Sequence, residues 1–201
     1  MKTVIISAVE FEAKPTLELL RRNNIPHEYF QFGIGPLNAT KSLNDLLKIS
    51  EGQNVLYLGS AGTFGHFDSP HLVTSEEVIW MPTAERMGLA KHMVDLHKPI
   101  KIPPIDKFDL PKRTVLTSSS VSFSGAISVD GLPDKELLVE NMEMYAVIPE
   151  ILSSAKRFQN ILGITNKVGP EGSVQWFKNF KSIANMTAEY IESNFDSLLS
   201  D

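Results

Sequence analysis

The sequence contains no cysteine among its 201 residues. Disulfide bonds, thiolate catalysis, cysteine-ligated zinc and iron–sulfur clusters are therefore excluded. A basic stripe is also missing, since lysine and arginine occur at most as short pairs such as Arg21-Arg22, and the net charge is -5. Such a chain carries no electrostatic footprint for nucleic acid or for an anionic membrane, so we expect neither as a partner.

Long apolar runs are missing as well. The apolar run near the N-terminus is too short to span a bilayer, and Glu10 and Glu12 interrupt it before a signal-peptide core could form. We therefore expect a buried first strand there and a cytoplasmic protein. No repeat or Gly/Ser-rich linker divides the chain, and its length suits one core, so we expect a single domain over residues 1–201.

Predicted strands and helices alternate in the first sixty residues. The compositions of residues 3–9, 27–32 and 54–58 predict three strands. Leucines at helical spacing predict helices over 12–22 and 37–48. This alternation predicts an α/β fold in which helices cover both faces of a parallel sheet.

The later elements are less regular. Five prolines fall from Pro82 to Pro111, so residues 81–111 are predicted to form an irregular excursion. Long loops in compact domains are usually functional or disordered, and we interpret this one as a lid or a subunit-contact segment. Outside it we predict strands over 72–80, 114–119, 136–139 and 161–165, and helices over 142–156 and 173–199.

Four polar clusters follow predicted strands. They are Glu10 with Glu12, the Gly59-Ser60-Ala61-Gly62 loop, Glu140 with Glu143, and Asn166. Ligands of parallel α/β sheets bind beyond the carboxyl ends of the strands, although loops collect polar residues in any case. The joint placement of the four clusters therefore favours one site at that edge.

Four segments, in this order, resemble signature segments of the nucleoside phosphorylase/nucleosidase superfamily. They are Ala8-Val9-Glu10-Phe11-Glu12, Gly33-Ile34-Gly35-Pro36-Leu37-Asn38-Ala39, Gly59-Ser60-Ala61-Gly62 and Val139-Glu140-Asn141-Met142-Glu143. The chain is most similar to two branches, the methylthioadenosine/S-adenosylhomocysteine nucleosidases and the futalosine hydrolases. The resemblance implies a three-layer α/β/α sandwich around a mixed, partly barrel-like sheet, a homodimer, and chemistry without metal or other cofactor.

The resemblance implies roles for two glutamates. Glu12 matches the residue that activates the attacking water, and a carboxylate beside a closed pocket can have a raised pKa and act as a general base. Glu143 matches the residue that accepts hydrogen bonds from the ribose hydroxyls, while Met142 packs on the sugar. Charge-assisted bonds of this kind are strong and also stabilise a neighbouring oxocarbenium ion. Alternatively, each glutamate only stabilises the N-terminus of a helix through the helix dipole and has no catalytic or binding role.

Asn166 departs from the adenine-specific nucleosidases, which carry an aspartate there. An asparagine cannot act as a general acid, but it can donate and accept hydrogen bonds, which suits a 6-oxopurine. Thr165-Asn166-Lys167-Val168 resembles phosphorylases of 6-oxopurines, and the same asparagine followed by Trp176 resembles futalosine hydrolases. The alternative is an asparagine that only holds a turn.

Hydrolysis is favoured over phosphorolysis because Tyr57 occupies the position at which hexameric phosphorylases carry a phosphate-binding arginine. Ser60 and the backbone amides of Ala61 and Gly62 are then expected near ribose and water. Phe123 either stacks on the purine or belongs to the core.

The histidines at 66, 71, 92 and 97 match no zinc motif, so we predict no metal. The sequence thus predicts a purine nucleoside N-ribosyl hydrolase acting on a small-molecule nucleoside. The alternatives are a methylthioadenosine/S-adenosylhomocysteine nucleosidase, a phosphorylase and a non-catalytic nucleoside sensor.

Overall fold

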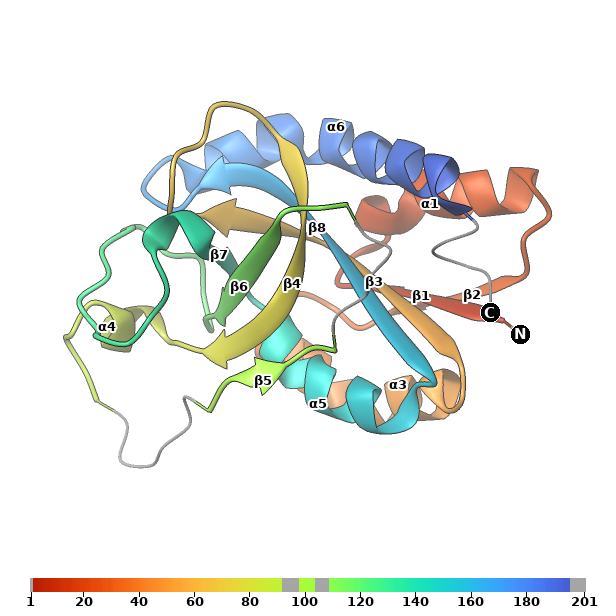
Figure 1. Cartoon of the computed structure of the whole chain (residues 1–201), viewed down its shortest axis with the longest axis horizontal. Helices are drawn as coiled ribbons and strands as arrows, with labels where there is room; N and C mark the ends of the chain where they lie inside the picture. Colours follow the sequence, from red (N-terminus) through yellow and green to blue (C-terminus); the bar gives the residue numbers. More distant parts are fainter. Residues whose placement is uncertain (1, 92–97, 104–108, 196–201) are drawn as a thin grey trace.

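The computed structural model describes residues 2–91, 98–103 and 109–195. All strands join one mixed, eight-stranded sheet (Figure 1). The strands are β1 (Thr3–Ser7), β2 (His27–Gln31), β3 (Asn54–Thr63), β4 (His71–Trp80), β5 (Ile100–Lys101), β6 (Lys112–Thr117), β7 (Leu138–Asn141) and β8 (Arg157–Lys167). The helices are α1 (Glu10–Arg22), α2 (Pro36–Lys41), α3 (Leu43–Ser50), α4 (Thr83–Arg86), α5 (Met144–Ser154) and α6 (Gly172–Ser193), with a 3-10 turn at Lys135–Leu137.

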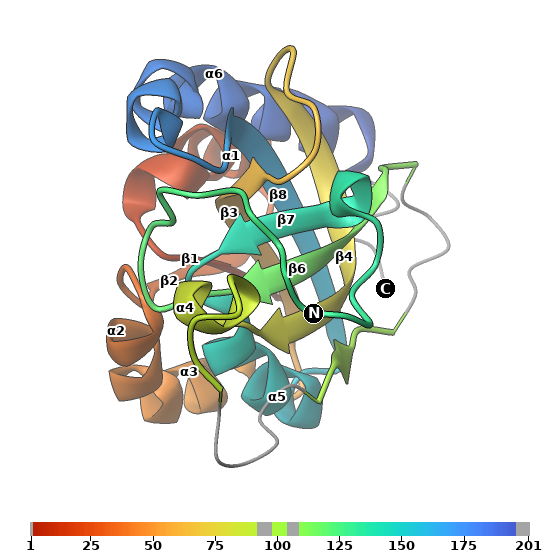
Figure 2. The same ribbon diagram turned by 90° about the vertical axis from the view of Figure 1, so that its left-hand side faces the viewer.

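Part of this sheet closes on itself. Strand β3 pairs with β8, β8 with β4, β4 with β6, β6 with β7, and β7 pairs back to β3 (Figure 2). At the start of β3, over residues 54–57, the parallel strand β1 pairs with it, and β1 and β2 extend the sheet as an open wing. The mixed, partly barrel-like sheet is therefore confirmed, whereas the early strand–helix alternation alone had predicted only a parallel one.

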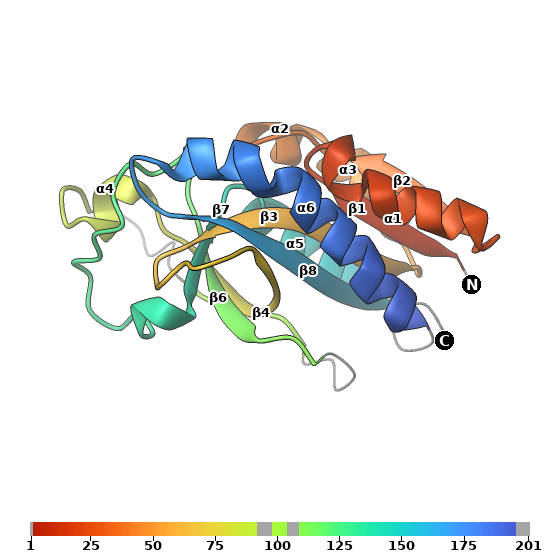
Figure 3. The ribbon, with the colours of Figure 1, turned by 90° about the horizontal axis from the view of Figure 1, so that it is seen from above.

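Helices cover both faces of the sheet. Helices α1 and α6 pack together on one face, and α3 and α5 lie on the other (Figures 1 and 3). All five residues of β1 are buried, as expected for a parallel strand covered on both sides. Gly163 of β8 permits the close approach of α6, because a β-carbon there would lie 2.0 Å from Cγ2 of Ile183.

The prediction of one continuous helix over 37–48 is wrong, because the structure has two helices there, α2 and α3. The chain breaks at Ser42, whose hydroxyl lies 3.1 Å from the carbonyl oxygens of Phe32 and of Asn38. A serine hydroxyl that bonds to nearby backbone competes with regular helix, and this one ties the break to the end of β2.

The predicted excursion over 81–111 contains regular structure. Helix α4 lies within it, and β5 pairs antiparallel with β4. Residues 92–97 and 104–108, with the histidines at 92 and 97, lie outside the described residues, so the lid or subunit-contact interpretation stays a prediction. The predicted end of the last helix at 199 also lies outside them.

The strand predicted over 136–139 is wrong by two residues. The 3-10 turn occupies its first half, and β7 follows from Leu138 to Asn141. Within the described ranges, no helix combines the length and the apolar character that crossing a membrane requires.

Candidate active site

The segment Gly59-Ser60-Ala61-Gly62 lies inside β3, which continues to Thr63, so the predicted loop is wrong. Both edges of this segment are occupied: β8 pairs with it in parallel, and β7 pairs antiparallel with Gly62 and Thr63. Pairing with β8 keeps the whole segment in the strand, and the backbone N–H of Ser60, on the edge that β8 does not occupy, donates to Glu12 instead. The Ser60 side chain is therefore presented by a rigid strand, and contacts of Ala61 and Gly62 with substrate stay predictions.

Glu12 lies in the first turn of α1, directly after β1. Its Oε1 accepts hydrogen bonds from the backbone N–H of Ser60 at 3.0 Å and from Ser60 Oγ at 2.7 Å. Its Oε2 is buried and has no hydrogen-bond partner. Burial raises the pKa of Glu12 to about 7, the Ser60 hydroxyl opposes this rise, and the nearby Glu143 adds to it. Glu12 is therefore a buried carboxyl group with a pKa near neutral, and the backbone N–H groups of Ser60 and Val9 lower that pKa slightly.

Glu143 lies between β7 and α5 and is only 5% exposed. Its Oε1 accepts a hydrogen bond of 2.8 Å from the N–H of Gly35, which has a φ of 80° that disfavours other residues. Burial raises the pKa of Glu143 to about 6, against the lowering effect of the Gly35 bond. Met142 is adjacent, since a β-carbon on Gly35 would lie 3.8 Å from its Cε.

Asn141 joins the two glutamates, and the sequence interpretation missed it. Its Nδ2 donates to the carbonyl of Ser60 at 3.0 Å, and its Oδ1 accepts from the N–H groups of Glu143 and Met144, both at 2.9 Å. A continuous set of hydrogen bonds therefore runs from Glu12 through Ser60 and Asn141 to Glu143. The position of Asn141 directly before Met142-Glu143 was the available signal, because asparagine is a favoured helix cap.

The antiparallel pairing of β7 with β3 brings the glutamates together. Gly62 lies opposite Glu140, so the following residues of β7 run back alongside Ser60. The pKa of the buried Tyr57 is raised well above its usual value by burial and then by both Glu143 and Glu12. Two glutamates that are far apart in the sequence thus lie close enough to the same tyrosine to raise its pKa.

Asn166 lies within β8, in register with Gly62. A β-carbon added to Gly62 or Gly172 would lie 2.7 or 3.1 Å from its Nδ2, so the amide is packed between the two glycines. Its Oδ1 accepts from Thr165 Oγ1 at 2.8 Å, and its Nδ2 donates to the carbonyl of Lys167 at 3.0 Å. These bonds fix the orientation of the amide and leave one N–H and one lone pair for a ligand.

Phe123 is 70% exposed, so its interpretation as a core residue is wrong. It lies in the segment between β6 and β7, where Ser118 and Ser122 donate to the carboxylate of Glu140. Burial raises the pKa of Glu140, and the Ser122 hydroxyl opposes the rise. Glu140 therefore anchors this segment, and stacking of Phe123 on a purine stays a prediction.

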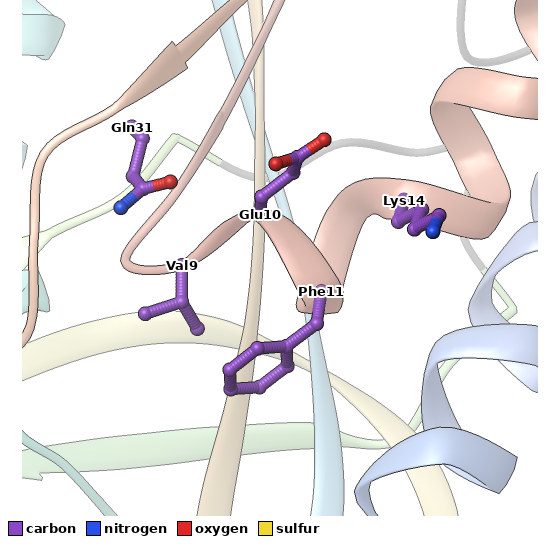
Figure 4. Close-up of a pocket in the computed structure, with 5 residues that line it drawn as sticks. All are labelled: Val9, Glu10, Phe11, Lys14 and Gln31. Carbon is purple, nitrogen blue, oxygen red and sulfur yellow. The ribbon is translucent and has the colours of Figure 1, made fainter.

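An open pocket lies beside the start of α1 (Figure 4). It has a volume of about 420 Å³ and is lined by Val9, Glu10, Phe11, Lys14 and Gln31. Neither Glu12 nor Glu143 lines it, so it differs from the site that the four polar clusters predicted, and we assign it no role.

No group of three or more histidine, aspartate or glutamate side chains in the described ranges is placed to hold a metal ion. His66 instead lies 2.7 Å from Asp68 at the surface. The clustered acids near Ser60 are bonded to backbone N–H and hydroxyl donors.

The closed strands, the open parallel wing and the two helical layers define a mixed-sheet α/β fold that solved nucleosidases share. A Chlamydia trachomatis protein described as MTAN superposes with a TM-score of 0.72 at 17% identity, covering 99% of this chain and 100% of its own. A 5′-methylthioadenosine/S-adenosylhomocysteine nucleosidase from Helicobacter pylori gives 0.71 at 13%, covering 98% and 99%. The futalosine hydrolase of Helicobacter pylori gives 0.70 at 13%, covering 98% of both chains.

The chain therefore has the nucleoside phosphorylase/nucleosidase fold over nearly its whole length, as the signature segments implied. No family model matches the sequence. No curated protein matches it either. The similarity is therefore one of structure, since the three proteins named above are only 13–17% identical to this chain in sequence.

Proposed function

We propose that the protein is a purine nucleoside N-ribosyl hydrolase. One observation carries the proposal: Glu12 and Glu143 interact electrostatically, have pKa values raised to about 7 and about 6, and are joined through Ser60 and Asn141. Buried titratable groups brought together at a strand edge are typical of catalytic sites.

The two glutamates suit different tasks. Glu143 accepts a hydrogen bond from the Gly35 N–H through Oε1, and its carboxylate is suited to accept further hydrogen bonds from the ribose hydroxyls. Its negative charge stabilises the positive charge that develops at the anomeric carbon as the glycosidic bond breaks. Glu12 holds Ser60 through Oε1, so Oε2 is the oxygen free to take a proton from the attacking water. A base with a pKa of about 7 is matched to that transfer at neutral pH.

We propose a 6-oxopurine as the base, as in futalosine. The free N–H of Asn166 suits the N7 or O6 acceptors of such a base, and its free lone pair suits a ring N–H. A site built around a fixed amide discriminates strongly, since a mismatched base leaves buried polar groups unpaired. Solved structures with this fold include both a futalosine hydrolase and adenine-nucleoside hydrolases, so the amide at this position is the feature that favours the oxopurine.

Water is the proposed acceptor of the ribosyl group. In the part of the chain that the structure describes, no lysine or arginine forms an ion pair with Glu12 or Glu143. Phosphate would therefore approach two carboxyl groups without a compensating guanidinium. Tyr57, at the position of the phosphorylase arginine, is fully buried.

Base release from inosine, futalosine and methylthioadenosine, followed by chromatography with and without phosphate, tests the proposal. We expect release from a 6-oxopurine nucleoside without phosphate, and its loss in Glu12→Gln. Glu10→Gln, which alters an exposed acid of the same helical turn, is the matched control and should remain active. Binding without release would indicate a sensor, and phosphate-dependent release would indicate a phosphorylase; either result overturns the proposal.

We also propose a cytoplasmic homodimer. The apolar side chains of Leu37, Leu89 and Phe123 are 77%, 74% and 70% exposed, and a subunit interface would remove such side chains from water. Light scattering coupled to size-exclusion chromatography should give twice the chain mass, and a monomer at micromolar concentration would contradict the dimer.

A further inference from the structure

Trp176 of α6 forms a directed hydrogen-bond relay with Ser60 and Glu12. Its Nε1–H donates to Ser60 Oγ at 3.0 Å. An indole N–H only donates, so the Ser60 oxygen accepts that bond and its own single proton is left for Glu12 Oε1 at 2.7 Å. The relay therefore has one direction, from Trp176 through Ser60 to Glu12.

We propose that Trp176 is a positioning residue for the general base: it locks the Ser60 hydroxyl onto Oε1 of Glu12 and so reserves Oε2 for the attacking water. The catalytic consequence rests on the proposed hydrolase function. The positioning itself rests on the hydrogen bonds and on the buried, unpartnered state of Oε2.

The indole is held rigidly. It stacks on Phe180 with ring centroids 5.1 Å apart and an interplanar angle of 15°, and it meets Phe11 edge-on at 5.7 Å. Phe11 directly precedes Glu12 in α1, so the same aromatic cluster supports the base and its relay. A donor held between two packed rings loses little conformational entropy when it binds.

The same helix reaches the proposed base-binding residue. Gln175 Oε1 accepts from the N–H of Lys167 at 2.9 Å, and Gly172 lies against the amide of Asn166. The start of α6 thus contacts both the strand that carries Asn166 and the serine that holds Glu12. Figure 3 shows α6 lying over β8, the strand that carries Asn166.

The relay predicts a direction of change in pKa. A hydroxyl that accepts a hydrogen bond becomes a stronger donor, and donation to a carboxylate favours its charged form. Loss of the indole N–H should therefore raise the pKa of Glu12 further. The titratable groups that interact with Glu12 are Glu143, Tyr57 and Tyr29, and both tyrosines have pKa values raised above 10. Of these three groups, Glu143 is the one whose pKa also lies near neutral, so its own variant must accompany the test.

Trp176→Phe keeps the aromatic packing and removes the donor. We expect the acidic limb of kcat/KM against pH to move up by about half a pH unit and kcat to fall about 3–10-fold, with KM nearly unchanged. Phe177→Leu, which alters the neighbouring, 72% exposed aromatic residue of α6, is the matched control and should leave the profile unchanged.

Ser60→Ala should abolish any further effect of Trp176→Phe, because the indole acts through the hydroxyl. The double variant should match Ser60→Ala within about twofold. Additive losses, or an acidic limb that does not move, would show that Trp176 only packs and would overturn the inference.

A second measurement does not depend on turnover. The chain has two tryptophans, so Trp80→Phe leaves Trp176 as the only indole fluorophore. Its emission should titrate with a midpoint near the Glu12 pKa of about 7, and the titration should disappear in Trp80→Phe/Glu12→Gln but persist in Trp80→Phe/Glu143→Gln. A flat emission would refute the relay even in an active enzyme. A titrating protein that cleaves no nucleoside would instead refute the proposed function and leave the relay standing.

Discussion

Replacing Glu12 with glutamine should remove a cost to stability that grows as the pH rises, and it should also remove the proposed base. Burial raises the pKa of this carboxyl group from 4.5 to about 7, so the folded state favours its protonated form. Below pH 4.5 the group is protonated in both states and costs nothing. As pH rises, the unfolded chain ionises first, and stability falls until the folded group has also ionised above pH 7. Linkage gives a cost of about 1 kcal/mol at pH 5 and about 3 kcal/mol at pH 8.

Urea unfolding of the wild type and of Glu12→Gln, followed by circular dichroism at pH 5 and pH 8, measures this difference. The free energy of unfolding of the variant relative to the wild type should increase by about 2 kcal/mol between the two pH values. The new amide group leaves a buried donor without a partner, at a cost of roughly 1–3 kcal/mol. That cost is the same at both pH values and cancels in the comparison. Glu10→Gln controls for loss of a negative charge from the same helical turn.

Two results would refute this reasoning. A variant whose relative stability is the same at pH 5 and pH 8 would mean that folding does not desolvate Glu12. If the wild type instead became more stable relative to the variant between pH 5 and pH 8, the two hydrogen bonds from Ser60 would outweigh burial and lower the pKa of Glu12.

Three further substitutions test other parts of the site and fold. Asn166→Asp places a carboxyl group against the carbonyl of Lys167, which lies 3.0 Å from the present amide nitrogen, and this contact favours the protonated, donating form of the carboxyl group. The substrate preference, measured as base release by chromatography, should then move towards adenine nucleosides. An unchanged substrate preference counts against the base assignment. Glu143→Gln should lower kcat/KM about 10–100-fold in steady-state assays, and an intact value would remove this residue from the ribose site. Gly163→Ala should lower the free energy of unfolding by about 2 kcal/mol, because its methyl group would collide with Ile183; unaltered urea unfolding would show that α6 shifts freely.

Local patterns were sufficient for the early elements. The β-branched run of β1, the leucine spacing of α1 and the glutamates of its first turn are short-range features, and β1 ends and α1 begins two residues before the predicted bounds. The Met142-Glu143 pair likewise lies at the start of a helix, as its signature segment implied. Such features depend on neighbours within a few residues, which is why a single sequence contains them.

Pairing between distant segments decided the rest. Glycines suggested a loop after residue 58, but β8 pairs with the whole segment and β7 pairs with its last residue, and this pairing keeps it in strand β3. The antiparallel return of β7, the asparagine that joins Ser60 to Glu143 and the indole that reaches Ser60 from α6 all join residues remote in the chain. The sequence by itself determined which acids and amides were available. The tertiary structure decided which of them meet and how far burial shifts their protonation, because desolvation and hydrogen bonding depend on neighbours that only the folded chain brings together.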